Sequence, residues 1–236
     1  MGDGVDLRHL SRWPVIVAPM AGGPSTPELV VAAAEAGGLG FLAAGYKTAE
    51  AMAAEIKAVR AALRSGAFGV NVFVPQPPAD RAVVDAYLET LEPEAAAAGV
   101  TLGEATWDDD GWEAKVEALL GDPPPVVSFT FGCPPTEVVA AFRHAGTLVA
   151  VTVTTPEEAA LAAAAGAGCL CVQGAEAGAH RGSFTNDDRP GGDWTLLALL
   201  AGIPPVTDLP LIAAGGIAGP RAVAAVLAAG AVAAQV

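Results

Sequence analysis

Apolar residues in this chain form short continuous runs that alternate with longer, Ala-rich stretches. Runs such as Val126-Val127-Ser128-Phe129 and Leu148-Val149-Ala150-Val151 are almost free of polar positions, which is typical of parallel strands buried on both faces. The pattern predicts strands near residues 15–18, 39–43, 68–73, 125–130, 147–153, 168–172, 210–214 and 231–236, with helical segments between them.

Residues that typically end or begin helices support this division. Ala-Gly pairs close the Ala-rich stretches just before apolar runs, and glycine after a helix adopts positive φ without a Cβ penalty. These pairs are Ala36-Gly37, Ala98-Gly99, Ala145-Gly146, Ala165-Gly166 and Ala229-Gly230. Helix starts are predicted where a capping residue precedes proline, at Thr26-Pro27, Thr155-Pro156 and Gly219-Pro220.

Strand and helix therefore alternate along the chain. Eight predicted strands in 236 residues fit an α/β fold of the (β/α)8 TIM barrel type better than an open, doubly wound sheet. No linker or break in composition appears, so residues 1–236 are expected to form a single domain. The last predicted strand ends with the chain, so the barrel is expected to be truncated within it.

Two segments contain more residues than one helix and its connecting loops between two strands would need. Residues 77–121 are predicted to contain a helix over about 80–97 and a short helix around 111–120, separated by the acidic turn Asp108-Asp109-Asp110-Gly111. Residues 174–192 are polar and Gly-rich and follow the sixth strand. Insertions after barrel strands lie on the face where catalysis occurs, so both are expected near the active site.

Composition excludes several classes of protein. The net charge of −14 is the wrong sign for binding phosphate backbones, so nucleic acid is not an expected partner. Apolar stretches fall short of the ~18–20 residues that a bilayer span needs, and the acidic N-terminus does not resemble a secretory signal, so a cytoplasmic protein without membrane contact is expected. The cysteines Cys133, Cys169 and Cys171 predict neither a disulfide framework nor a metal site, and the latter two are expected in the core.

Two early segments carry candidate chemistry. Residues 13–23 form a strand that runs into a Pro- and Gly-rich loop containing Pro19, Met20 and Ala21, where backbone could approach a planar ring closely. An ordinary Gly-rich turn is the alternative. Asn71 stands near the end of an otherwise apolar strand, where a buried amide serves either a ligand or a hydrogen bond in the core.

Two later segments add to them. The segment from Gln173 to Gly182 follows a strand directly and places His180, a side chain that readily binds or exchanges a proton, on a rim loop. A surface histidine is the alternative. Gly215 and Gly216 end the seventh strand just before a helix start, a pattern typical of phosphate binding. Because P-loop, HExxH and Gly-x-Ser-x-Gly motifs are absent, the chemistry is expected to come from a phosphate-bearing cofactor.

Taken together, these segments resemble the flavin-dependent nitronate monooxygenase family, formerly called 2-nitropropane dioxygenases, over nearly the whole chain. The resemblance rests on Pro19-Met20-Ala21-Gly22-Gly23, Gly69-Val70-Asn71-Val72-Phe73, Ser128-Phe129-Thr130-Phe131-Gly132, the segment Gln173 to Gly182, and Ala213-Ala214-Gly215-Gly216-Ile217. It implies an FMN-binding TIM barrel that oxidises alkyl nitronates, such as propionate 3-nitronate, with O2 through a flavin semiquinone, giving a carbonyl product and nitrite. The sequence leaves open whether the chain is a monomer or a homodimer.

The resemblance also implies roles for single residues. His180 would face the substrate, and FMN would be bound by Pro19, Met20, Ala21, Asn71, Gln173, Gly174, Gly178, Gly215 and Gly216. The chain departs from the family at Ala179, where a second glycine is usual, and at its end, where the family continues with a Gly-Thr phosphate loop, a helix and a small helical region that helps to cover the substrate. If these 236 residues are the whole natural protein, half of the phosphate site and one substrate wall are expected to be missing; a fragment of a longer gene is equally compatible with the sequence.

Two alternatives stay open. An FMN- and NADH-dependent enoyl-acyl-carrier-protein reductase shares the fold and a similar histidine loop, although Gln173 and Arg181 favour the monooxygenase. A degenerate barrel that binds a phosphate ligand or a protein partner without turnover is the other.

Overall fold

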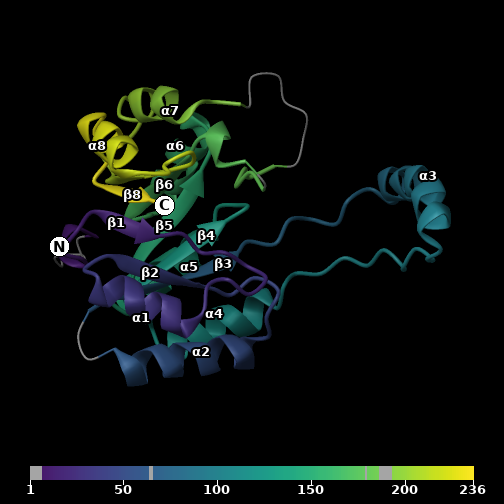
Figure 1. Cartoon of the computed structure of the whole chain (residues 1–236), viewed down its shortest axis with the longest axis horizontal. Coiled ribbons are helices and arrows are strands. Elements are labelled where there is room, and N and C mark those ends of the chain that lie inside the picture. Colours follow the sequence, from purple (N-terminus) through teal and green to yellow (C-terminus); the bar gives the residue numbers. More distant parts are fainter. Residues whose placement is uncertain (1–6, 64–65, 179, 186–192) are drawn as a thin grey trace.

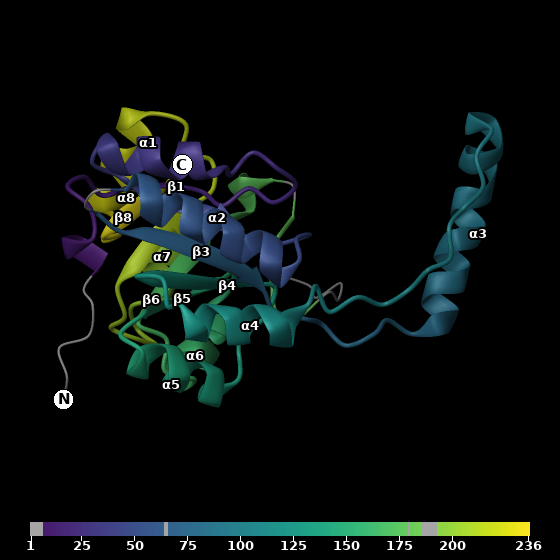
Figure 2. The same cartoon turned by 90° about the horizontal axis from the view of Figure 1, so that it is seen from below.

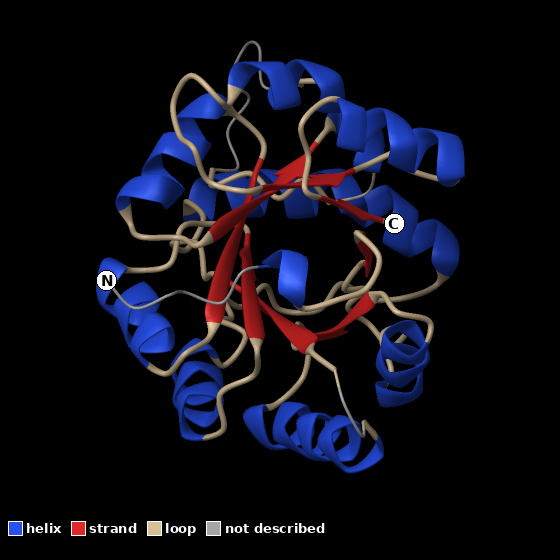
Figure 3. Ribbon diagram, turned by 90° about the vertical axis from the view of Figure 1, so that its left-hand side faces the viewer, coloured by secondary structure: helices blue, strands red, loops and turns tan. Residues whose placement is uncertain are grey.

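A computed structural model describes residues 7–63, 66–178, 180–185 and 193–236. Within these residues the strands β1–β8 close, in chain order, into a parallel barrel, and Figure 3 shows helices surrounding it. The strands are β1 (Val15–Val17), β2 (Leu39–Ala43), β3 (Phe68–Phe73), β4 (Val126–Thr130), β5 (Leu148–Val153), β6 (Cys169–Gln173), β7 (Leu211–Ala214) and β8 (Ala233–Gln235). The fold is a (β/α)8 TIM barrel, as the strand and helix pattern predicts.

The helices are α1 (Pro27–Glu35), α2 (Ala49–Ala62), α3 (Arg81–Ala98), α4 (Trp112–Gly121), α5 (Thr136–His144), α6 (Pro156–Ala164), α7 (Leu196–Gly202) and α8 (Pro220–Ala228), with 3-10 turns η1 (Leu7–His9) and η2 (Ala175–Ala177). The predicted starts hold: the hydroxyls of Thr26 and Thr155 accept from the N–H groups of Leu29 and Glu158. The predicted stops hold as well, because the glycine of every Ala-Gly pair has positive φ.

The insertion between β3 and β4 contains one barrel helix and one projecting helix. Helix α4 packs beside β3 and α5 and places Trp112 against Phe129, with ring centroids 5.7 Å apart. Helix α3 instead stands away from the barrel at the end of two extended segments in both Figure 1 and Figure 2. It leaves Val83 and Tyr87 exposed to solvent. Only α4 therefore takes the covering position that barrel topology requires.

The core has two layers that fix the register of the strands. Side chains such as Met52, Phe129 and Phe142 pack between the barrel and the surrounding helices. Inside the barrel pack Ile16, Phe41 and other side chains that point to the axis. A Cβ at Gly69 would overlap the ring of Phe41, so glycine in β3 makes room for this ring. The end of the barrel toward which the strands run is left open for a site.

No helix within the described residues has the length and apolar character that crossing a membrane would take.

Candidate cofactor and active site

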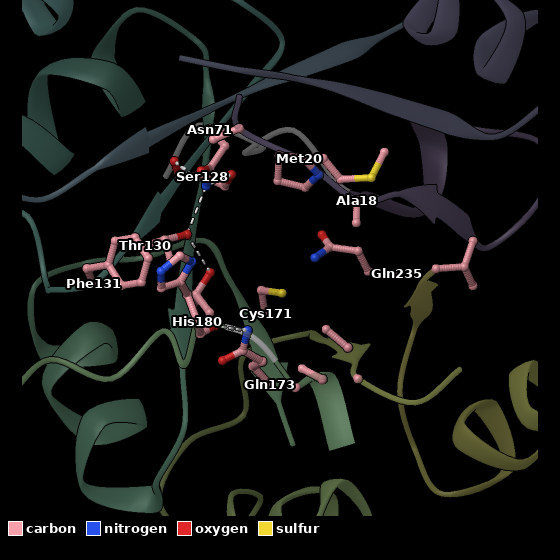
Figure 4. A pocket seen from close by; sticks show the side chains of 18 of the residues that line it. Ala18, Met20, Asn71, Ser128, Thr130, Phe131, Cys171, Gln173, His180 and Gln235 are labelled. Atoms are coloured by element: carbon pink, nitrogen blue, oxygen red, sulfur yellow. Dashed lines mark hydrogen bonds between the residues drawn. The ribbon is translucent and has the colours of Figure 1, made fainter. Parts of the chain in front are cut away.

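A cavity of about 500 Å³ lies at the carboxyl ends of the barrel strands, the face on which TIM barrels bind ligands. Its size falls in the range of small-molecule sites, roughly 300–1,000 Å³. Figure 4 shows side chains from opposite strands pointing into it. It is lined by Ala18, Pro19, Met20, Ala21, Tyr46, Asn71, Phe73, Ser128, Thr130, Phe131, Thr152, Cys171, Gln173, Ala177, Gly178, His180, Ala214, Gly215, Gly216, Ile217, Gln235 and Val236.

A hydrogen-bonded polar row crosses β3, β4 and β5 at the base of the cavity. The amide nitrogen of Asn71 lies 2.9 Å from both Ser128 Oγ and Thr130 Oγ1. The hydroxyls of Thr130 and Thr152 are 3.2 Å apart. The row forms because Asn71 is paired in register with Ser128 in the parallel sheet. Because the side-chain nitrogen of Asn71 donates its hydrogen bonds to Ser128 and Thr130, its side-chain carbonyl oxygen is the group left to bind a ligand.

The loop after β6 folds back onto the strand that precedes it. Gln173 donates from Nε2 to the carbonyl of His180 at 3.3 Å and accepts at Oε1 from the N–H of Gly182 at 2.7 Å. One carboxamide thus holds the backbone on both sides of Arg181. This brings the imidazole of His180 to the cavity wall, edge-on to Phe131 (Figure 4).

Two carboxylates brace the same loop from outside the cavity. Glu176 accepts from the N–H of Leu196 at 2.9 Å, at the start of α7. Glu158, which is buried, accepts from the backbone and hydroxyl of Thr154 and from the N–H of Phe184 at 2.8 Å. Charged acceptors make stronger hydrogen bonds than neutral ones, so these contacts restrain the loop that carries His180.

The loop after β7 brings backbone close to the loop after β6. Gly215 and Gly216 have φ values of +108° and +68°. A Cβ at Gly215 would lie 2.9 Å from the nitrogen of Ala177, and one at Gly216 would lie 2.8 Å from Cβ of Glu176. The loop leads into α8, whose N-cap Gly219 offers no side-chain cap. Backbone N–H groups in such a turn and at a helix start suit an anion.

The loop after β1 is closed by a serine. Ser25, which is buried, accepts from the N–H of Met20 at 2.8 Å and donates from its own N–H to the Met20 carbonyl at 3.4 Å. Gly22 and Gly23 supply the positive φ that this short turn needs. As a result the side chain of Met20 stands at the cavity edge, 41% exposed (Figure 4).

Charge is distributed unevenly between the cavity and the rest of the chain. Of the described residues that line the cavity, none has a carboxylate, ammonium or guanidinium side chain, although the chain carries 26 acidic residues. Burial raises the pKa of Cys171 to about 12, so its thiol is neutral at the cavity floor. In a cavity without side-chain carboxylates, an anionic ligand meets little repulsion.

The structure assembles the residues that the sequence singles out. Pro19, Met20, Ala21, Asn71, Gln173, Gly178, His180, Gly215 and Gly216 all line the cavity. Gly174 lies behind it, buried between Glu176 and Leu196, where a Cβ would overlap both. Ala179 lies outside the described residues. Cys169 and Cys171 are buried, as expected of core residues.

Sequence reasoning did not select Thr130, Thr152, Cys171 or Gln235, which also line the cavity. The sequence does contain a pattern from which some of these residues could have been predicted. Polar residues recur at alternate positions near the ends of predicted strands, as in Ser128 and Thr130, and alternate residues of a strand share one face. Tyr46 gave no such signal, because it belongs to a connecting loop.

A TIM barrel whose Gly-rich loops, carboxamides and single histidine meet at its catalytic end is typical of an enzyme that uses a phosphate-bearing organic cofactor. The model of the nitronate monooxygenase family matches residues 7–236. The chain therefore belongs to the nitronate monooxygenase family.

Individual relatives agree with this assignment. The chain is 40% identical over 229 residues to a nitronate monooxygenase of Paraburkholderia phytofirmans and 42% identical over 231 residues to one of Pseudomonas aeruginosa, alignments that cover 94% and 95% of this chain. The solved structure of nitroalkane oxidase from Streptomyces ansochromogenes superposes with a TM-score of 0.90 at 51% identity, covering 96% of this chain. FabK from Thermotoga maritima superposes with a TM-score of 0.70 at 27% identity, covering 95% of this chain and 58% of its own.

The chain spans less than two thirds of its relatives. It covers 61% and 64% of the two nitronate monooxygenases and 65% of the nitroalkane oxidase.

Proposed function

We propose that this chain carries the FMN-binding and catalytic part of an enzyme that oxidises alkyl nitronates of the propionate 3-nitronate type with O2, giving a carbonyl product and nitrite. One observation above all supports the proposal: motif residues from separate segments of the chain line the same cavity. Among the described residues that line it, none has a carboxylate side chain. Membership of the family gives the reaction class.

The residues of the cavity fit FMN. A flat ring system with amide-like edges needs hydrogen-bond partners, and the carbonyl oxygen of Asn71 is left to accept from its N–H group, while Gln173 lines the cavity and holds the backbone of the His180 loop beside it. A phosphate needs backbone N–H groups at close range, and the loop of Gly215 and Gly216 before α8 brings such groups to the cavity because the absence of Cβ atoms lets it pack closely against the turn of Glu176 and Ala177. We therefore infer that Asn71, Gln173, Pro19, Met20 and Ala21 hold the ring, and that Gly178, Gly215 and Gly216 hold the phosphate side, with Gly174 supporting them from behind.

Bound FMN would supply the electron transfer between the nitronate and O2. The protein's own task is to bind and orient the anionic substrate. His180 does so by donating a hydrogen bond to a nitronate oxygen, and as imidazolium it adds an opposite charge. With a neutral nitroalkane, the neutral imidazole accepts the proton from the carbon next to the nitro group.

The first test is the visible absorption spectrum of the purified chain after incubation with FMN and removal of the excess. Flavin bands that stay with the protein, followed by O2 uptake that depends on added nitronate, are the expected results. Bound flavin without nitronate-dependent O2 uptake would refute the oxidation and favour a non-catalytic barrel. Rapid anaerobic bleaching of the flavin by NADH would favour the enoyl reductase instead.

A further inference from the structure

Two threonine hydroxyls meet across neighbouring strands at the base of the cavity. Thr130 ends β4, and Thr152 lies on β5, one position beyond the paired residues Phe129 and Val151. Both side chains line the cavity, and their oxygens are 3.2 Å apart. Strand register brings them together, because neighbouring positions of a parallel sheet present their side chains on the same face. We call Thr130 and Thr152 the threonine pair.

The threonine pair keeps one hydrogen-bond donor for the cavity. Each hydroxyl has one hydrogen and two acceptor lone pairs. Thr130 Oγ1 accepts from the amide nitrogen of Asn71 at 2.9 Å, so this contact uses no hydroxyl hydrogen (Figure 4). The contact within the pair uses one of the two hydrogens, whichever residue donates it. The second hydrogen is left for an acceptor atom of a ligand.

The direction of these hydrogen bonds favours Thr152 as the residue that keeps the second hydrogen. Accepting from the amide of Asn71 polarises the hydroxyl of Thr130 and makes it the better donor, so Thr130 donates to Thr152. The thiol of Cys171 also interacts with Thr152, but sulfur is a weak acceptor. A ligand oxygen therefore competes successfully with the thiol for the hydrogen of Thr152.

The loop after β6 restrains both threonine side chains. A Cβ at Gly182 would lie 2.8 Å from Cγ2 of Thr152 and 3.3 Å from Cγ2 of Thr130, so the glycine backbone packs directly on the two methyl groups. Gly182 is buried, and its N–H donates to Oε1 of Gln173 at 2.7 Å. Because the methyl and hydroxyl of threonine share one Cβ, holding the methyl holds the hydroxyl. The donor is thus in place before a ligand binds.

The row across β3, β4 and β5 offers an acceptor and a donor to the same ligand. The side-chain oxygen of Asn71 is the acceptor, and Thr152 provides the donor. The imide edge of a flavin ring has the complementary groups, an N–H beside carbonyl oxygens. Hydrogen bonds to this ring are one means by which a protein tunes the electronics of the cofactor.

We propose that Thr152 contacts the cofactor: its hydroxyl donates to a carbonyl oxygen of the flavin imide whose N–H group donates to Asn71. Reduction adds negative charge to the ring, and a hydrogen bond to a charged acceptor is stronger than one to a neutral acceptor. Thr152 therefore binds reduced FMN more tightly than oxidised FMN and raises the reduction potential of the cofactor. This inference rests on the proposed function and deepens it, because it assigns a residue that tunes electron transfer from the nitronate.

A binding test needs no turnover. FMN, 2-thio-FMN and 4-thio-FMN are titrated against the wild-type chain and Thr152→Val, and binding is followed by the change in visible absorption. Sulfur accepts a hydrogen bond more weakly than oxygen, so we expect the wild-type chain to bind one of the thio analogues about threefold to tenfold more weakly than FMN. In Thr152→Val this ratio should fall at least threefold. Ratios unchanged for both analogues overturn the proposal.

The reduction potential gives a second readout. FMN-loaded protein is reduced anaerobically with dithionite beside a reference dye. We expect Thr152→Val to lose about tenfold more affinity for reduced than for oxidised FMN, which lowers the two-electron potential by about 30 mV. Thr152→Ser keeps the hydroxyl and should stay near wild type. An unchanged potential in Thr152→Val overturns the proposal.

A matched control lies directly before β5. Thr147 is also buried, and its hydroxyl donates to the carbonyl of Pro124 at 2.8 Å, away from the cavity. Thr147→Val should therefore lower thermal stability and leave the potential and the affinity ratios unchanged. An equal fall of the potential in Thr147→Val and Thr152→Val would show a general effect of losing a buried hydroxyl and overturn the proposal.

Two further variants keep the test decisive. Thr152→Ala replaces Thr152→Val if the valine variant does not fold, and the same outcomes apply to it. Gly182→Ala displaces the methyl groups of the threonine pair, so it should reduce the preference for FMN over the thio analogue; wild-type ratios would refute the positioning by Gly182. A chain that binds none of the flavins refutes the FMN site and this inference with it. A chain that binds FMN and oxidises no nitronate refutes only the proposed oxidation, and the affinity ratios and potentials still decide the role of Thr152.

Discussion

The imidazole of His180 meets the ring of Phe131 edge-on, with centroids 6.3 Å apart and planes at 87°. Phe131 is itself held with φ of +71°, and its carbonyl accepts a hydrogen bond from the side chain of Gln76. The backbone of His180 is tied to Gln173. The imidazole is therefore positioned by the loops after β3, β4 and β6 together, and its place in the cavity depends on the closed barrel.

Replacement of His180 tests its contact with substrate. We expect His180→Ala to lower kcat/KM for alkyl nitronates by about a hundredfold or more, the size typical of losing an acid, base or charged partner. Bound flavin should stay within about twofold of wild type, because backbone and carboxamides hold it. His144→Ala, at the end of α5, is the control and should leave O2 uptake unchanged. Undiminished O2 uptake in His180→Ala would remove this residue from the mechanism.

Asn71 is expected to contribute to stability as well as to binding. In Asn71→Ala the buried oxygen of Ser128 loses its donor and Thr130 keeps only its contact with Thr152, and leaving a buried acceptor unpaired costs about 1–3 kcal/mol. Urea denaturation followed by circular dichroism should show a loss of this size. Ser128→Ala removes only one acceptor of the same amide and should cost less. Equal losses in the two variants would contradict the view that the Asn71 amide organises this row.

The glycine loop before α8 allows a matched comparison. An alanine at Gly216 would need positive φ and would approach Cβ of Glu176 to 2.8 Å, whereas Gly219 has φ of −177° and nothing within 4 Å of the added Cβ. We expect Gly216→Ala to weaken FMN binding at least tenfold and Gly219→Ala to change it by less than about twofold. Quenching of flavin fluorescence measures both. Wild-type affinity in Gly216→Ala would show that this loop does not hold the phosphate.

Thiol reactivity should report the burial of the cysteines. Desolvation raises the pKa of Cys171 from its usual 9.0 to about 12, and it raises that of Cys169 as well. Because the folded pKa lies above the unfolded one, this contribution to stability is complete below pH 9 and is lost as the pH rises from 9 toward 12. Between pH 7 and 9, a disulfide reagent should therefore modify Cys133 alone in the native protein and all of the cysteines in urea. Rapid native modification of a Cys171-only variant (Cys133→Ser/Cys169→Ser) would contradict this burial.

Much of the fold could be predicted because its determinants are local. Continuous apolar runs predict strands, a threonine before proline predicts the start of α1 and α6, and glycine after alanine predicts the helix ends, as the positive φ of Gly37 and Gly166 shows. Each signal depends on a few neighbouring residues and on backbone sterics alone. The loop residues Met20, His180 and Gly216 could be selected for the same reason.

Other features were decided only by the closed barrel. The register of β3 with β4 sets Asn71 against Ser128, and the packing of α4 brings Asp110 to the backbone of Tyr46. The sequence around Gly174 does not show that the side chain of Glu176 folds back over this glycine or that Leu196, 22 residues later, packs against it. The sequence by itself determined the strands, the helices and the residue types available for chemistry. Which of them share the cavity was decided by the tertiary structure, because contacts between distant segments depend on strand register and barrel closure, to which every element contributes.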